Sequence, residues 1–183
     1  MVRRSRKNIS RVSPLKKFIY LISPSKINKK FYNNLDAVLS YGNVKFFQLR
    51  LKKIDKNNLL SIASKIRKIT SKHKVKFIIN DKYVLVTRSK ADGCHMGQLD
   101  GSIEIAKKKL KNKILGITCH NSKILATKAV EIKATYLAFG SFFKSKLKPN
   151  AIKANFDILR WAKKKFKKPI VAIGGINNLN YKK

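Results

Sequence analysis

Three hydrogen-bond donors with alternate spacing stand at the end of one short apolar segment. Gln48, Arg50 and Lys52 are two residues apart, so in an extended strand their side chains point to the same side. Burying three such donors without an anionic partner is costly, and a diphosphate offers several oxygens that suit the fork of an arginine guanidinium. The spacing therefore indicates a diphosphate site, and an edge strand with solvated charges is the alternative.

Two carboxylates follow other apolar segments. Asp81 comes after Asn80 at the end of one predicted strand, and Asp100 follows the next one, in a chain with only 8 Asp and Glu residues. Two carboxylate ligands together with phosphate oxygens are a donor set that Mg²⁺ commonly takes. The alternative is that each aspartate merely caps a helix, Asp81 one that begins near Tyr83 and Asp100 one that begins near Ser102.

A hydroxyl and an imidazole share one side of a later strand. Thr118 and His120 have the same parity, so both reach the strand end, where the hydroxyl could hold a phosphate oxygen or the edge of a pyrimidine ring. The dipeptides Cys94-His95 and Cys119-His120 suggest zinc, but adjacent strand residues point to opposite faces and cannot all converge on one ion. We therefore expect no zinc site, and we expect histidines at strand ends to be hydrogen-bonded structural residues.

Two glycine-containing segments near the end of the sequence could meet anions. The loop over residues 140–149 is long and rich in donors, as a loop over an anionic substrate would be, although a solvated lysine loop would look similar. Gly174 and Gly175 stand at the exit of the last predicted strand, where paired glycines let backbone N–H groups approach a phosphate closely.

The elements that must position these residues alternate between short apolar runs and helical spacing, which is typical of repeated βα units. One predicted helix, 56–73, carries its apolar residues on a single stripe. The strands are expected at 17–22, 44–49, 76–79, 91–95, 114–119, 135–139 and 170–173, and the helices at 33–39, 56–73, 83–89, 102–110, 122–132 and 155–166.

This order predicts an α/β fold, a TIM (β/α)₈ barrel without its last βα unit, and a flavodoxin-like open sheet is the alternative. The barrel is favoured because nearly every strand ends in side chains suited to anions or metal, and barrel enzymes place their sites at that face.

Composition bounds the class of protein. The chain has 183 residues with 44% hydrophobic content, enough for one core, and we expect a barrel domain over 17–183 after a basic tail over 1–16. Two cysteines, without a C-x-x-C pair, favour a reducing cytoplasm, and no apolar run is long enough to cross a membrane. The net charge of +36 would suit nucleic acid, but its lysines are dispersed, which indicates a solvated surface and makes nucleic-acid binding the weaker hypothesis.

Six motifs, in this order, resemble those of the thiamine-phosphate synthase family, which includes TenI-like relatives. They are Q-L-R-L-K (48–52), I-N-D (79–81), A-D-G-C-H-M-G-Q-L-D (91–100), G-I-T-C-H (116–120), A-F-G-S-F-F with K-P (138–149) and V-A-I-G-G-I (171–176). The match runs from about residue 17 to residue 176. It implies a transferase that uses Mg²⁺ to join hydroxymethylpyrimidine diphosphate to thiazole phosphate, and these small molecules are the expected partners.

The resemblance also implies roles for single residues. Arg50 and Lys148 would stabilise the departing pyrophosphate as the catalytic pair, Asp81 and Asp100 would bind the metal, and Gly175 would meet the thiazole phosphate. The substrate-binding residues that it implies are Gln48, Arg50, Lys52, Asn80, Thr118, Ser145, Lys148 and Gly175.

The sequence departs from the family pattern in two places. Where the family has Pro-Thr-x-Thr-Lys, this chain has residues 144–148, K-S-K-L-K, which keep one hydroxyl, Ser145, and replace the other with leucine. The sequence stops at residue 183, before an eighth strand and its helix, so we expect unpaired edges on the first and seventh strands. A TenI-like barrel that binds a thiazole or thiamine phosphate without condensation is the alternative, although the donors and both aspartates would have little use there.

Overall fold

The computed structural model describes residues 17–144 and 151–182. The predicted tail over 1–16, Ser145 and Lys148 lie outside these residues. The strands are β1 (Ile19–Ile22), β2 (Val44–Leu49), β3 (Lys76–Asn80), β4 (Gly93–Met96), β5 (Ile114–His120), β6 (Tyr136–Phe139) and β7 (Ile170–Ala172). The helices are α1 (Lys29–Ser40), α2 (Lys56–Lys72), α3 (Ile103–Leu110), α4 (Lys123–Glu131) and α5 (Asp157–Lys165), with a short 3₁₀ turn, η1 (Tyr83–Leu85).

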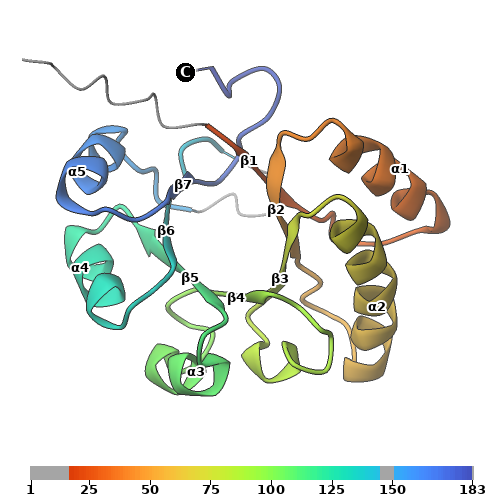
Figure 1. The fold of residues 1–183 in the computed structure, drawn as a ribbon. Coiled ribbons are helices and arrows are strands. Elements are labelled where there is room, and N and C mark those ends of the chain that lie inside the picture. The colour runs from red at the N-terminus through yellow and green to blue at the C-terminus, as the bar shows by residue number, and fades with distance from the viewer. Residues whose placement is uncertain (1–16, 145–150, 183) are drawn as a thin grey trace, which may run out of the picture.

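The strands form one parallel sheet in the order of the sequence, from β1 to β7. Figure 1 shows this sheet curled into a ring with the helices around its outside. A doubly wound open sheet would reverse its strand order at a switch point, so the flavodoxin-like alternative is wrong and the TIM-like barrel is confirmed. Within the described residues, β1 pairs with β2 alone and β7 with β6 alone, which agrees with the expected unpaired edges.

Apolar residues pack on both sides of the curled sheet. Between sheet and helices lies the larger core, in which Phe47, Phe77 and Ile66 are fully buried. Inside the ring a smaller cluster forms around Tyr136 and Val171. The predicted stripe of α2 is part of the larger core, because Leu59, Ala63, Ile66 and Thr70 are its buried residues. These two layers fix the strand ends, and through them the polar side chains described below.

Side-chain caps explain where most helices begin. Asn28 accepts a 2.9 Å hydrogen bond from the N–H of Phe31, so α1 begins at Lys29, four residues before the expected start. Asp55, Ser102 and Ser122 cap α2, α3 and α4 in the same way. None of the helices in the described part of the chain is long and apolar enough to cross a membrane.

Two further predicted elements are wrong in extent. The helix expected at 83–89 is only the 3₁₀ turn η1, followed by turns. The strand expected at 91–95 begins at Gly93, because the N–H of Ala91 donates to the carbonyl of Val86 in the preceding turn and does not join the sheet. Both errors come from turn hydrogen bonds that close within a few residues and leave no periodic pattern.

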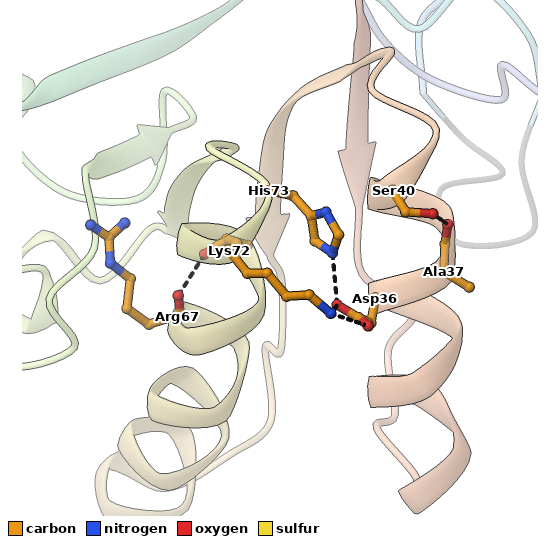
Figure 2. Close-up of polar contacts among 7 residues, drawn as sticks. Asp36, Ala37, Ser40, Arg67, Lys72 and His73 are labelled. Carbon is orange, nitrogen blue, oxygen red and sulfur yellow. Dashed lines mark hydrogen bonds and ion pairs between the residues drawn. The ribbon is translucent and has the colours of Figure 1, made fainter.

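An ionic cluster joins α1 to the end of α2. Figure 2 shows the Asp36 carboxylate on α1 facing Lys72 and His73. The ammonium of Lys72 lies 2.8 Å from one carboxylate oxygen, and Nε2 of His73 lies 2.7 Å from the other. These contacts lower the pKa of Asp36, chiefly through the hydrogen bonds from Lys72 and then His73. The cluster therefore links α1 to the C-terminal end of α2 on the outside of the barrel.

Candidate active site

One open cavity of about 210 Å³ lies at the carboxyl ends of the strands. The face that barrel enzymes use therefore holds the polar residues that the sequence singled out. The predicted site residues that line it are Gln48, Arg50, Lys52, Asn80, Asp81, Asp100 and Thr118. They come from β2, β3 and β5 and from the segments that follow β2, β3 and β4, so the shared parity of the donors and the strand-end positions do bring these side chains together.

The donors on β2 are fixed by neighbouring strands. Gln48 is only 2% exposed and donates a 2.6 Å hydrogen bond from Nε2 to Oδ1 of Asn80, at the end of β3. The hydroxyl of Ser23 accepts from the backbone N–H of Arg50 at 2.9 Å, and the N–H of Ser23 donates to the carbonyl of Gln48. Ser23 follows β1 and was not among the predicted residues. It holds the backbone on which Arg50 is placed.

The two aspartates lie together beside a lysine. The side chains of Asp81 and Asp100 share a hydrogen bond, and Nζ of Lys52 lies 3.8 Å from Oδ2 of Asp81. Burial, and after it the hydrogen bond and charge of Asp100, raise the pKa of Asp81 to about 6, although Lys52 and Arg50 oppose the shift. A pair of carboxylates that hold a proton between them is a site that a divalent cation can take over.

Neither aspartate caps a helix. The residue before η1 is Lys82, and it makes no side-chain cap. α3 is capped by Ser102, whose hydroxyl accepts from the N–H of Ile105, while Oδ2 of Asp100 accepts from the N–H of Gly97 at 2.9 Å. The cap alternative is therefore wrong for both residues, because each carboxylate turns toward the cavity or its rim loop.

Four side chains that line the cavity from inside the barrel form a hydrogen-bonded chain. Thr118 Oγ1 lies 2.8 Å from Nε2 of His95, and Nδ1 of His95 lies 2.9 Å from the hydroxyl of Tyr136. That hydroxyl lies 2.6 Å from the hydroxyl of Tyr20. The expectation that a strand-end histidine is hydrogen-bonded is confirmed for His95. The two tyrosines were not predicted, although their inward strand parity together with an apolar ring could have indicated them.

Two other residues complete the walls. Gln98 lines the cavity and donates from Nε2 to the carbonyl of Thr118 at 2.6 Å, which joins the rim loop to β5. His120 also lines the cavity, beyond an irregularity in the pairing of β5 with β6 that lies between Thr118 and His120. Thr118 and His120 therefore still face the same side of the sheet, as their spacing in the sequence predicted, even though β5 is irregular between them.

Gly175 lies beside the segment that follows β6. Its φ is +69°, and a β-carbon there would lie 2.5 Å from the carbonyl oxygen of Phe143. The N–H of Phe143 in turn donates to the carbonyl of Gly174 at 3.0 Å. Only glycine fits both the backbone angle and the space, so the paired glycines permit the close approach of two backbone segments.

Comparison with known proteins agrees with this geometry. The sequence model of the family described as thiamine monophosphate synthase matches residues 19–183, which is more than half of the chain. The chain belongs to the thiamine-phosphate synthase family. It is 54% identical over 169 residues to the thiamine-phosphate synthase of Pelagibacter ubique, covering 92% of this chain and 82% of that protein. It is 41% identical over 163 residues to that of Erythrobacter litoralis, covering 86% and 76%.

Solved structures give the same result. The thiamine phosphate pyrophosphorylase of Pyrococcus furiosus superposes with a TM-score of 0.79 at 28% identity, over 90% of this chain and 78% of that one. A 3-hexulose-6-phosphate synthase, with a TM-score of 0.55 and 14% identity over 86% of this chain and 80% of that one, shares the fold alone.

The resemblance in the sequence motifs is therefore confirmed, and so are the barrel fold and an enzyme of this transferase family. The relatives named above carry the synthase name, which favours a synthase over a TenI-like barrel without condensation activity. Nothing in these likenesses supports the nucleic-acid hypothesis that the net charge suggested.

Proposed function

We propose that this chain condenses hydroxymethylpyrimidine diphosphate with thiazole phosphate, which yields thiamine phosphate and pyrophosphate. Family membership supports the reaction, and the cavity supports its chemistry. The single observation that carries the proposal is that Arg50 and Lys52 stand over a carboxylate pair, Asp81 and Asp100, in one cavity. Such a mixture of charges suits a diphosphate that brings a metal ion with it.

Mg²⁺ fits the residues present. Asp81 and Asp100 offer hard oxygen ligands, and the raised pKa of Asp81 shows that its negative charge is costly in this partly buried position beside Asp100, a cost that a bound cation would relieve. Within the described residues no group of three or more His, Cys, Asp or Glu side chains could hold a metal ion by itself, so phosphate oxygens and water would complete the coordination shell. When bound, Mg²⁺ would neutralise charge on the diphosphate and make pyrophosphate a better leaving group.

The side chains around the diphosphate would act by binding and charge. Arg50 can grip two phosphate oxygens with its fork, and Lys52 supplies a second positive charge beside the metal. As the carbon–oxygen bond breaks, both of its electrons leave with pyrophosphate, so negative charge grows where Arg50, Lys52 and Lys148 are proposed to lie. The thiazole nitrogen then donates its lone pair to the pyrimidine methylene carbon, and no strong general base is required.

Other residues would orient the substrates. Gln48 and Asn80, locked together at 2.6 Å, are proposed to hold the pyrimidine diphosphate, and Thr118 is proposed to offer its hydroxyl from the cavity floor. Gly175 is proposed to present its backbone N–H to the thiazole phosphate. Ser145, together with Lys148 already named, is proposed to reach the substrates from the segment that lies outside the described residues.

The proposed setting is a reducing cytoplasm with one catalytic domain over 17–183 after a basic tail. Cys94 and Cys119 are both free and buried, which supports a compartment in which thiols stay reduced. The two phosphorylated substrates are the proposed partners.

The test is formation of thiamine phosphate by the purified chain, followed by chromatography, with both substrates and with or without Mg²⁺. Isothermal titration with the pyrimidine diphosphate alone separates binding from turnover. Mg²⁺-dependent turnover would support the proposal. A folded chain that binds the pyrimidine diphosphate but forms no product would contradict the synthase assignment, and one that binds only thiamine phosphate would favour the TenI-like alternative.

A further inference from the structure

The hydrogen-bonded chain inside the barrel has two possible directions. Its members, in order, are Tyr20, Tyr136, His95 and Thr118, with separations of 2.6, 2.9 and 2.8 Å between the polar atoms. A neutral imidazole has one N–H donor and one bare nitrogen acceptor. If His95 accepts a hydrogen bond from one neighbour, it therefore donates one to the other. The tautomer of His95 therefore decides what the Thr118 hydroxyl does with its proton. Either the hydroxyl donates it to His95, or it accepts from His95 and can donate its own proton to a ligand in the cavity.

The chemistry of the partners favours one direction. A phenol is a stronger donor than an aliphatic hydroxyl, because its oxygen shares its lone pairs with the ring, and for the same reason it is the poorer acceptor. Burial raises the pKa of Tyr20 and of Tyr136 above its usual value near 10, so both phenols keep their protons. The favoured arrangement has Tyr20 donating to Tyr136 and Tyr136 donating to Nδ1 of His95. The proton of His95 is then on Nε2 and is donated to Thr118.

We infer that Tyr136 is a positioning residue, which holds His95 in the Nε2–H tautomer and thereby makes the Thr118 hydroxyl a hydrogen-bond donor to the substrate. Thr118 Oγ1 accepts from His95, so its own proton points out of the chain, and Thr118 lines the cavity. The ligand atom that it meets must be an acceptor, such as a phosphate oxygen or a ring nitrogen. The part of this inference that concerns substrate rests on the function proposed above.

Packing holds Tyr136 in the position that this role needs. Tyr136 is 1% exposed, and a β-carbon at Gly116 on the neighbouring strand would collide with its ring. The ring of Tyr136 also lies 5.6 Å from the rings of both Tyr20 and Phe46, measured between centroids. Glycine at position 116 and the surrounding rings leave the phenol little freedom, so its hydroxyl is delivered to His95 without a large loss of entropy.

The first test is the tautomer of His95 in the ligand-free chain, measured by ¹⁵N–¹H correlation NMR of the imidazole rings. The chain has only 3 histidines, so the variants His73→Gln and His120→Gln assign the spectrum. A proton on Nε2 alone is expected. A proton on Nδ1 alone, or on both nitrogens, would overturn the inference. This measurement needs no substrate, so it decides the inference even if the wild-type chain proves inactive, a result that would count against the proposed function only.

The second test asks whether Tyr136 acts through Thr118. Tyr136→Phe removes the phenol donor, and Thr118→Val removes the hydroxyl; each is expected to lower kcat/KM about tenfold, as for loss of one hydrogen bond. The double variant is expected to lose no more than Thr118→Val alone. Thr118→Ser should keep most of the activity, and Tyr41→Phe, at a phenol that is 82% exposed, should change nothing.

Circular dichroism and thermal melting establish that each of these variants is folded. Losses that multiply in the double variant would show that the two residues act separately and would overturn the inference. So would a Tyr136→Phe variant whose His95 keeps the Nε2–H tautomer while its activity falls.

Discussion

The carboxyl groups of Asp81 and Asp100 share a hydrogen bond across the ends of two neighbouring strands, β3 and β4. Two carboxylates this close cannot both be charged at low cost unless a cation lies between them. Lys52 approaches Asp81 only to 3.8 Å, and its side chain is half exposed, so it offsets little of that cost. The pair is thus arranged for a ligand that brings positive charge.

Metal dependence is expected to rest on both carboxylates. Asp81→Asn and Asp100→Asn should each remove the part of pyrimidine diphosphate binding that needs Mg²⁺, because an amide is a far weaker ligand for a hard cation. Isothermal titration with and without Mg²⁺ measures this. Asp157→Asn, on the exposed surface of α5, is the matched control and should bind as the wild type does. Full Mg²⁺-dependent binding by either site variant would exclude that carboxylate as a ligand.

The pair should also leave a signature in stability against pH. The pKa of Asp81 is about 6 in the folded chain, above its ordinary value near 4. At pH values between these two pKa values, the folded chain therefore binds more protons than the unfolded chain. In the absence of metal the free energy of unfolding should therefore fall as pH rises from 4 to 6, by about 1 kcal/mol after solvent screening.

Thermal unfolding in a chelator, compared between the wild type and Asp81→Asn, isolates this contribution from those of the other carboxylates. The difference should grow in favour of the variant as pH rises through this window. A constant difference across the window would show that Asp81 has an ordinary pKa. Added Mg²⁺ should reverse the loss in the wild type only.

Arg50 should not be replaceable by lysine. Arg50→Lys keeps the positive charge but loses the two-pronged grip on phosphate oxygens, so kcat/KM is expected to fall about a hundredfold. Steady-state kinetics with both substrates measures the loss. Lys53→Ala is the control, because Lys53 is exposed and does not line the cavity. Equal activity of Arg50→Lys and wild type would mean that charge alone suffices at this position.

Gly175→Ala is expected to destabilise the chain by about 1–3 kcal/mol, since a side chain at φ +69° is strained and its β-carbon would press on the carbonyl of Phe143. If Gly175 meets the thiazole phosphate, KM for that substrate should rise more than KM for the pyrimidine diphosphate. Urea unfolding and steady-state kinetics test the two effects separately. Gly42→Ala, also at positive φ but with open space around it, controls for backbone strain alone.

The cluster between α1 and α2 should contribute to stability without affecting activity. Asp36→Asn removes the negative charge and one of the two acceptor oxygens that Lys72 and His73 contact, and it should lower the melting temperature (Figure 2). Because the pKa of Asp36 is lowered in the folded chain, its contribution is present above its ordinary value and is lost as pH falls through the folded value. Differential scanning calorimetry at two pH values measures this. A variant that melts with the wild type at neutral pH would show that the cluster adds nothing.

Much of the fold was predictable because periodicity is a local property. The stripe of α2 and the alternation of apolar runs with helical segments indicated the order of the elements, and the polar side chains at the strand ends favoured the barrel. Boundaries failed where short-range turns decided them, as at η1 and the start of β4. Gln48 and Lys52 were predicted on one side of β2 because strand parity fixes direction, and both do line the cavity.

The spacing of residues along a strand predicts which side of the sheet each side chain faces, but it does not predict the distance between side chains on different strands. The first was determined by the sequence, and the second was decided by the tertiary structure. The sequence determined which side chains reach the strand ends: the donors after β2, the aspartates and Thr118. Only the pairing of β3 with β4 in the tertiary structure decided that Asp81 meets Asp100, and only the observed side-chain contacts showed that neither caps a helix. Tyr20 and Tyr136, 116 residues apart, meet only because the curled sheet brings β1 across to β6. Contacts between distant strands depend on curvature and register, which no local pattern encodes.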